Sequence, residues 1–281
     1  MMPAGIPPVR IALGIEYDGA AFTGWQTQTD GRGVQDALEN ALAQVAGAST
    51  ATICAGRTDS GVHALDQVVH FDTAAGRPIT AWVRGVNRFL PASIAVQWAR
   101  PVGQDFHARY GARRRRYDYW ILNAPMRSPL AHARTGWVFR PLDENAMRQA
   151  ATHLIGRHDF TSFRSAECQA ATPVRDIEEL RVDRKGSLVR VSITANAFLH
   201  HMVRNIVGAL VYVGVGRRPH HWIKDVLNAR DRVAGAPTFS AAGLYLARVE
   251  YDLALGLPAP GAGPIWIDAY TNQDLRADAR G

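Results

Sequence analysis

Residues 51–72, ATICAGRTDSGVHALDQVVHFD, contain two apolar runs separated by a polar loop. The run at 51–56 leads into the loop, and the run at 66–72 has the length and composition of a returning strand. Gly56 and Gly61 flank the loop and permit positive φ angles there. The stretch therefore predicts two neighbouring strands joined by a loop that projects from the edge of a sheet.

Helical patterns lie on both sides of this strand pair. GVQDALENALAQVAG (33–47) has apolar residues at helical spacing and ends at a glycine, and ITAWVRGVNRFL (79–90) precedes Pro91. Further strands are predicted at 10–17, where apolar residues alternate, and at 93–100. The second helix is expected to carry Trp82, Val83, Val86 and Phe89 on one face. The order β-α-β-β-α-β is the ferredoxin-like arrangement of many RNA-binding modules.

The second half of the chain repeats this order loosely. Strands are predicted at 115–122 and 243–252, helices at 143–156, 200–216 and 219–230, and a hairpin at 174–198 that turns at Lys185-Gly186. The helix at 200–216 is expected to bury Met202, Val203, Ile206, Val207, Leu210 and Val211.

We therefore predict an α+β protein built from a duplicated unit. Two ferredoxin-like (RRM-like) halves, at 10–104 and 105–255, are expected to form a continuous, mostly antiparallel sheet with a cleft between them. Residues 1–9 are expected to form a flexible arm, and 256–281, which are rich in Pro and Gly at their start, a tail of unknown role.

Composition narrows the class of partner. The 281 residues carry 32 Lys and Arg against 25 Asp and Glu, a net charge of +7, which favours a polyanionic partner. Two cysteines, Cys54 and Cys168, are too few for a disulfide framework or a four-ligand zinc site. The start lacks the pattern of a signal peptide, and no apolar run approaches the ~20 residues that span a bilayer. We expect a cytoplasmic protein.

Asp59 lies at the centre of the opening loop, and three interpretations of it stay open. Asp in a polar hairpin turn commonly bonds local amides and does nothing more. A cation site is less favoured, because Asp66 and Asp72 lie inside the following strand and hard cations need several convergent oxygens. The third is a nucleophile or base kept ionised by a guanidinium. Arg57 is close in sequence but can equally point away.

The densest basic run is ARRRRYDYW (112–120). It is either a solvated charge run or an RNA-binding patch made by Arg113, Arg114, Arg115 and Arg116. In the second interpretation Tyr117, on one strand face with Tyr119 and Ile121, stacks on a base while the arginines hold phosphates. Base–aromatic stacking is worth ~1–3 kcal/mol.

A second arginine, Arg204, falls within the apolar set of 197–208, near the start of a helix. A buried arginine needs a partner, because an unpaired buried charge costs several kcal/mol. Any nearby acid or a phosphate satisfies this requirement, and the sharper hypothesis pairs Arg204 with the carboxylate of the opening loop. The adjacent histidine pairs at 200–201 and 220–221 diverge by about 100° on a helix, so neither forms an i, i+4 metal site. No GxGxxG or P-loop is present, and no nucleotide cofactor is expected.

Together these segments resemble the bacterial tRNA pseudouridine synthase A family. The matching stretches run in order along nearly the whole chain: EYDGAAFTGWQ (16–26), VQDALE (34–39), AGRTDSGVHALDQVVHF (55–71), LPASI (90–94), DFHARYGARRRRYDYWI (105–121), HDFTSFRSAECQ (158–169), FLHHMVRNIVG (198–208) and GLYL (243–246).

The resemblance implies a role for several residues. It makes Asp59 the catalytic nucleophile, Tyr117 the tyrosine that stacks on the target base, and Arg204 the partner of the catalytic aspartate. It also implies that Leu244 packs against the target base, and that Arg57 and His63 touch RNA. The implied reaction is isomerisation of uridine to pseudouridine at positions 38, 39 and 40 of the tRNA anticodon arm. It implies a homodimer, no cofactor and no metal.

Overall fold

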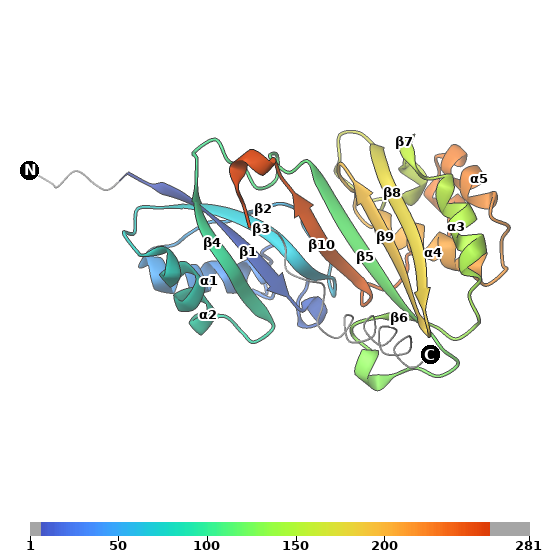
Figure 1. The fold of residues 1–281 in the computed structure, drawn as a ribbon, viewed down its shortest axis with the longest axis horizontal. Coiled ribbons are helices and arrows are strands. Elements are labelled where there is room, and N and C mark those ends of the chain that lie inside the picture. Colours follow the sequence, from blue (N-terminus) through green and yellow to red (C-terminus); the bar gives the residue numbers. More distant parts are fainter. Residues whose placement is uncertain (1–6, 259–281) are drawn as a thin grey trace, which may run out of the picture. The chain divides into compact units, whose positions relative to one another are not determined.

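The computed structural model describes residues 7–258, which divide into two compact units (Figure 1). Unit 1 runs from the first described residue to Arg114 and takes in the chain again from Leu246, and unit 2 is Arg115–Tyr245. The division falls inside the arginine run, later in the chain than the boundary expected from the sequence. Most of the predicted N-terminal arm and nearly all of the predicted tail lie outside the described residues.

Unit 1 has the β-α-β-β-α-β order predicted from the sequence. The elements are β1 (Val9–Tyr17), α1 (Val34–Ala46), β2 (Ile53–Cys54), β3 (His63–Thr73), α2 (Val86–Phe89) and β4 (Ile94–Val102). Strand β1 lies between β4 and β3 and pairs antiparallel with both, while the short β2 pairs antiparallel with β3. The two helices pack beside each other. This is the ferredoxin-like order, so the predicted fold of the first half is confirmed.

Helix α1 ends where the sequence predicts. Gly47 caps it with a φ of 76°, a left-handed conformation that glycine adopts without strain. Val34, Leu38 and Leu42 lie on its buried face, as their spacing predicts.

The helix predicted at 79–90 differs from the structure. Ala81–Gly85 form a π turn, and only Val86–Phe89 form the α-helix α2. Trp82 and Val86 are buried, but Phe89 is 50% exposed. The prediction was therefore wrong for Phe89, because a π turn contains more residues per turn than an α-helix and rotates the following side chains away from the predicted face.

Unit 2 repeats the same order with additions. Its elements are β5 (Arg114–Asn123), β6 (Gly136–Val138), α3 (Glu144–Thr152), β7 (Gly156–Asp159), β8 (Val174–Lys185), β9 (Leu188–Ala195), α4 (Met202–Gly214), α5 (Trp222–Ala229) and the start of β10 (Leu244–Glu250). The strands β5, β9, β8 and β7 follow one another and pair antiparallel, and β6 pairs parallel with β5. The predicted second α+β half is confirmed.

Several details of unit 2 follow the sequence and two do not. The β8–β9 hairpin turns at Gly186, whose φ is 55°, as predicted. The buried face of α4 contains Met202, Val203, Ile206, Val207, Leu210 and Val211, also as predicted. Helix α3 ends at Thr152, earlier than predicted, and the chain reverses at Gly156 with a φ of 98° to start β7. The short strands β6 and β7 were not predicted.

Short turns complete the described chain. Single 3-10 turns lie at Gly19–Ala21, Pro129–Ala131, Thr161–Phe163, Arg232–Ala234 and Leu253–Leu255. Among the helices within residues 7–258, none has the length and apolar character that crossing a membrane requires.

His70 is a buried histidine of β3 and is only 3% exposed. Its Nδ1 accepts a hydrogen bond of 3.1 Å from the backbone N–H of Ala108. Burial, and then the charge of Arg10, lower the pKa of His70 from 6.5 to about 4. The folded protein therefore holds this imidazole neutral at pH values where the unfolded chain protonates it.

We predict that His70 makes unit 1 less stable in acid. Its contribution is fully present above the unfolded pKa of 6.5 and is lost as the pH falls towards about 4, since the unfolded state then binds more protons. The free energy of unfolding, measured with urea at several pH values in this range, should fall with decreasing pH in the wild type. In His70→Gln the slope of this free energy against pH should be smaller by up to about 1.4 kcal/mol per pH unit. His132→Gln, at an exposed position, is the control. Equal slopes for wild type and His70→Gln would contradict the prediction.

Candidate active site

The opening loop of residues 56–62 lies in unit 1 and presents a half-buried Asp59. The preceding residue, Thr58, is buried and held twice: its carbonyl accepts from the N–H of Trp25 at 3.0 Å, and its Oγ1 lies 2.8 Å from the hydroxyl oxygen of Tyr17. After Asp59, the N–H of Val62 donates to the Asp59 carbonyl at 3.1 Å and closes a turn. The backbone that carries Asp59 is thus held on both sides of this residue.

The segment 17–25 wraps around this loop. Phe22 accepts two hydrogen bonds at its carbonyl, from the N–H of Gly61 at 3.4 Å and from the Oγ of Ser60 at 3.3 Å. Gly24, with a φ of 106°, lies so close that a Cβ there would be 2.8 Å from the Thr58 carbonyl oxygen. At Gly19 an added Cβ would be 1.9 Å from the carbonyl oxygen of Val62. These glycines allow backbone to pack directly on backbone.

Gln67 of β3 holds the start of the loop. Its Nε2 donates to the Gly56 carbonyl at 2.5 Å, and its Oε1 accepts from the Gly56 N–H at 3.3 Å. Gln67 is completely buried, so its amide satisfies both backbone groups of Gly56 and has its own donor and acceptor satisfied in return. A loop fixed in this way suits a catalytic group, since a reacting atom has to be held within a fraction of an ångström.

The two neighbours that the resemblance expects to touch RNA differ in exposure. Arg57 is exposed, and among residues 7–258 it forms no ion pair, so it does not provide the counter-ion of Asp59. His63 is only 2% exposed, and its Nδ1 accepts from the N–H of Gly19 at 3.1 Å. The same Nδ1 lies 3.1 Å from an oxygen of Asp18. Because this nitrogen accepts the hydrogen bond from the Gly19 N–H, it carries no proton. His63 thus helps to hold the segment that wraps the loop.

Two other acids of unit 1, Asp66 and Asp72, bind partners outside the loop. Asp66 is buried and accepts from the N–H of Val249 at 3.0 Å. Asp72 is paired with Arg10 through two contacts of 2.8 Å, and this hydrogen-bonded pair lowers the pKa of Asp72. The two acids are six positions apart on β3, about 20 Å at ~3.3 Å per residue. Asp66 and Asp72 do not converge on one ion.

The predicted tyrosine face of β5 is buried. Tyr117 is 8% exposed and meets the ring of Phe198 edge-on, with centroids 4.9 Å apart and an interplanar angle of 81°. Tyr119 is fully buried, its hydroxyl donates to the Ser240 carbonyl at 2.8 Å, and burial raises its pKa. Of these two tyrosines, only Tyr117 retains any exposed surface.

Arg204 and Leu244 border the same loop of unit 2, residues 237–243. The Nε of Arg204 donates to the Phe239 carbonyl at 2.9 Å, and the N–H of Phe239 donates to the Arg204 carbonyl at 3.3 Å. Leu244, 5% exposed, begins β10 immediately after this loop, and its N–H donates to the Ala241 carbonyl at 2.9 Å. Arg204 is half-buried, so its apolar stem packs while the head reaches polar partners.

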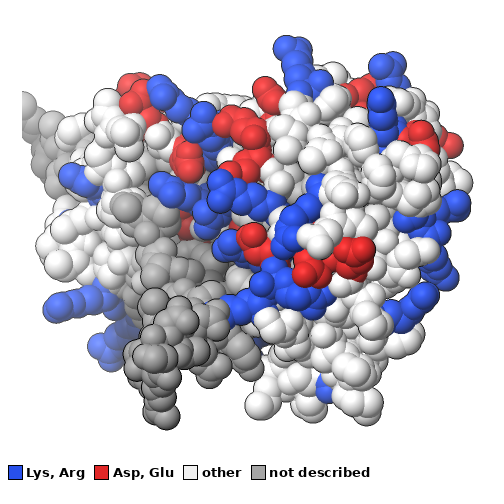
Figure 2. Space-filling model, turned by 45° about the vertical axis from the view of Figure 1, so that its right-hand side comes forward, with Lys and Arg blue, Asp and Glu red and all other residues white. Residues whose placement is uncertain are grey.

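The arginine run 113–116 is largely engaged within the protein. Arg113 forms an ion pair with Asp252, and Arg114 lies 3.7 Å from Glu250. In unit 2, Arg115 is buried and donates to the Asn196 carbonyl at 3.0 Å, and Arg116 lies 3.4 Å from Asp118. Figure 2 shows how often Lys and Arg side chains lie next to Asp and Glu on the face turned forward. The run offers less free positive charge than its sequence suggests.

Sequence reasoning did not assign the residues that fix the loop. Tyr17, Gly24, Trp25, Thr58 and Gln67 have no titrating or nucleophilic role, and only tertiary contacts reveal what they hold. A signal was present: two glycines and three aromatic residues within EYDGAAFTGWQ are more than a plain connection between a strand and a helix needs.

Comparison with known proteins agrees with the resemblance. A family model described as tRNA pseudouridine synthase matches residues 14–111 and 150–252. The chain is 54% identical over 267 residues to tRNA pseudouridine synthase A of Burkholderia lata, covering 95% of this chain and 99% of the relative. It is 54% identical over 253 residues to the protein of that name from Herminiimonas arsenicoxydans, covering 89% and 92% of the two chains. With the enzyme of the same name from Paraburkholderia xenovorans, identity is 52% over 265 residues, covering 94% and 98%. The chain therefore belongs to the tRNA pseudouridine synthase family, a family of isomerases.

Proposed function

We propose that this protein converts uridine to pseudouridine at positions 38, 39 and 40 of the tRNA anticodon arm, with Asp59 as nucleophile and without a cofactor. The observation that carries the proposal is the rigid presentation of one half-buried carboxylate in a chain of this family. An inert turn, the alternative from composition, gives no reason for two glycines to pack backbone against this loop.

The reaction requires few chemical groups from the enzyme. The N1–C1′ bond of uridine breaks, the uracil rotates, and C5 bonds to C1′ while the C5 hydrogen leaves as a proton and N1 takes up a proton. Atoms and electrons balance without redox chemistry. The Asp59 carboxylate begins the reaction by adding to C6, by attacking C1′ or by removing the C2′ proton. The target base has to leave its stack to reach the carboxylate.

The resemblance supplies partners for Asp59 from unit 2. In this proposal Arg204 keeps the carboxylate ionised, Tyr117 stacks on the target base, and Leu244 provides an apolar wall that shields the freed uracil from water.

Two Tyr117 variants separate stacking from proton transfer. Tyr117→Phe keeps the ring and its edge-on contact with Phe198, whereas Tyr117→Leu removes the ring. If stacking is the role, Phe should retain most of the affinity for tRNA, and Leu should lose ~1–3 kcal/mol of binding free energy. If the hydroxyl transfers a proton, kcat should instead fall by about 10²-fold or more in both variants. Steady-state kinetics on one purified tRNA distinguish the two roles, and wild-type behaviour of both variants would contradict both.

Release of label from tRNA tritiated at uracil C5 tests the function directly. Pseudouridine formation transfers that tritium to water, so the wild-type protein should release it, and EDTA should leave the rate unchanged. Absence of release from several tRNAs would favour an RNA-binding protein without catalysis. Cleavage of the tRNA that EDTA abolishes, without tritium release, would favour a metal-dependent nuclease or hydrolase.

We further propose that the protein is a cytoplasmic homodimer. The resemblance implies the dimer, and an exposed apolar surface supports it. In unit 2, Met126, Leu130 and Phe139 all lie exposed within the segment 124–140. Exposed apolar surface of this kind is common at protein–protein contacts. The mass in solution, measured by light scattering, checks the stoichiometry.

The free thiols of Cys54 and Cys168 fit a reducing compartment.

A further inference from the structure

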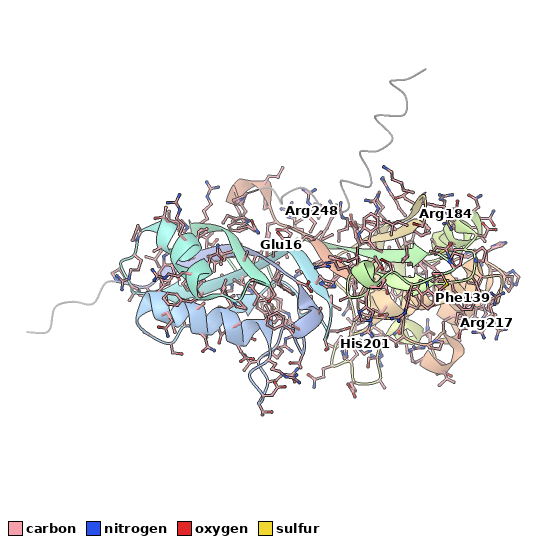
Figure 3. All side chains as sticks on the ribbon, turned by 90° about the horizontal axis from the view of Figure 1, so that it is seen from below. Glu16, Phe139, Arg184, His201, Arg217 and Arg248 are labelled. Carbon is pink, nitrogen blue, oxygen red and sulfur yellow. The ribbon has the colours of Figure 1, made fainter. Side chains whose placement is uncertain are left out.

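Two arginines and two aromatic side chains form a stack where α4 ends and α5 begins. The guanidinium carbon of Arg217 lies 4.8 Å from the centre of the Tyr212 ring, and that of Arg218 lies 5.5 Å from the Trp222 ring. The two rings are nearly parallel, at 19°, with centroids 6.2 Å apart. We name these four residues the arginine–aromatic stack. Figure 3 labels Arg217, which projects at the margin of unit 2.

The backbone fixes the stack in place. The N–H groups of Arg217 and Arg218 both donate to the Tyr212 carbonyl, at 2.9 and 3.3 Å, and Gly216, with a φ of 72°, turns the chain to allow it. An arginine on an aromatic face gains ~0.5–1 kcal/mol at an exposed site. Less side-chain entropy is therefore lost when such a guanidinium meets a ligand than when a freely rotating arginine does.

Apart from the aromatic rings, neither cation of the stack has a side-chain partner in the part of the chain that the structure describes. Arg217 and Arg218 are exposed, and within residues 7–258 no acid pairs with either side chain. This distinguishes them from Arg113 and Arg114, which pair with Asp252 and Glu250. The rings of Tyr212 and Trp222 contact each other and the two guanidinium groups. A ligand would therefore meet the N–H edges of the guanidinium groups and not an aromatic face.

The surroundings add positive charge. Lys224, His220 and His221 are exposed beside the stack, and the ring of His220 stacks on that of His153 at 6.2 Å. Burial lowers the pKa of His153, and the charges of His220, Lys224 and His221 lower it further, opposed by Asp225 alone among the causes. Basic side chains therefore outnumber acidic ones among the groups that shift the pKa of His153.

We propose that the arginine–aromatic stack binds the phosphate backbone of the tRNA substrate, as a contact that raises affinity without taking part in the chemistry. This inference rests on the proposed function, because that function supplies tRNA as the ligand. A guanidinium presents paired N–H donors that match two phosphate oxygens, and two such groups, each over one of two rings whose centroids are 6.2 Å apart, suit neighbouring phosphates of an RNA strand. No residue of the stack was singled out as functional from the sequence.

The double variant Arg217→Gln/Arg218→Gln tests the contact by equilibrium binding to one purified tRNA at several salt concentrations. Each phosphate contact contributes about 0.9 to the slope of log affinity against log salt, so the slope should be smaller by about 2. Affinity at moderate salt should fall roughly tenfold, and KM should rise by a similar factor while kcat at saturating tRNA stays unchanged. An unchanged slope and KM would overturn the proposal.

Matched variants exclude trivial explanations. Arg190 also lies over a tryptophan, 5.7 Å from the Trp120 ring, but it is paired with Asp183 at 2.9 Å, so Arg190→Gln should leave the salt slope unchanged. Arg217→Lys/Arg218→Lys keeps both charges and should keep most of the slope. Equal loss in the Gln and Lys pairs would mean that packing and not charge was removed, and would overturn the proposal. Tritium release by the wild type is a separate readout: its absence rejects the proposed function, whereas an unchanged slope with normal release rejects only the stack.

Discussion

Asp59→Ala is expected to abolish tritium release from C5-labelled tRNA, by about 10³-fold or more, while tRNA affinity changes little. In the proposed mechanism the variant has no group to attack the uridine, so the activity should fall. Affinity is retained because binding depends mainly on phosphate contacts made elsewhere. Asp59→Asn should behave in the same way, since an amide preserves the shape and removes the nucleophilic oxygen charge.

A folding control and a matched acid complete this experiment. Asp59 is half-buried, so both variants should unfold within about 1 kcal/mol of the wild type. Asp30 is an acid of the same unit that forms a surface ion pair with Arg32 at 2.8 Å, and Asp30→Ala should retain full activity. Substantial tritium release by a correctly folded Asp59→Ala protein would show that another group is the nucleophile.

Gly24→Ala is expected to have the second largest effect, although residue 24 does not itself react. Its φ of 106° strains any L side chain, and the new Cβ would lie 2.8 Å from the carbonyl oxygen of Thr58. Because backbone cannot rotate away as a side chain can, the residues before and after Asp59 have to shift. A displacement of about 1 Å at a catalytic group costs ~10²-fold in rate. We expect kcat to fall by about that factor, with a smaller change in tRNA affinity.

Gly31→Ala is the matched control for this change. Gly31 lies in the same connection between β1 and α1 and has a positive φ of 66°, but an added Cβ would meet nothing within 4 Å. Both variants therefore incur backbone strain, and only Gly24→Ala adds the contact with the loop. We expect Gly31→Ala to lose stability, by about 1 kcal/mol, and to keep activity within a few-fold of the wild type. Equal losses of kcat in the two variants would mean that strain, and not displacement of Asp59, is responsible.

Local physics explains why the elements were predictable. Alternating apolar residues in β1, the spacing of Val34, Leu38 and Leu42 in α1, and the glycine after α1 each depend on residues within a few positions of one another. Where the prediction was wrong, at Phe89, a π turn altered the helical period, which no residue type marks in the sequence.

By itself, the sequence determined the α+β order of both halves, the family, and Asp59 as the candidate nucleophile, because short-range periodicity and motifs at family-like spacing are written in neighbouring residues. Only the tertiary structure decided what those residues meet. Gly24 packs on a carbonyl more than 30 positions away, and Arg113 and Arg114 are engaged by acids more than 130 positions away. Arg217 and Arg218 remain unpaired within the described chain. Which charges stay available and which loop is rigid are properties of contacts between distant segments, and a contact exists only after the chain has folded.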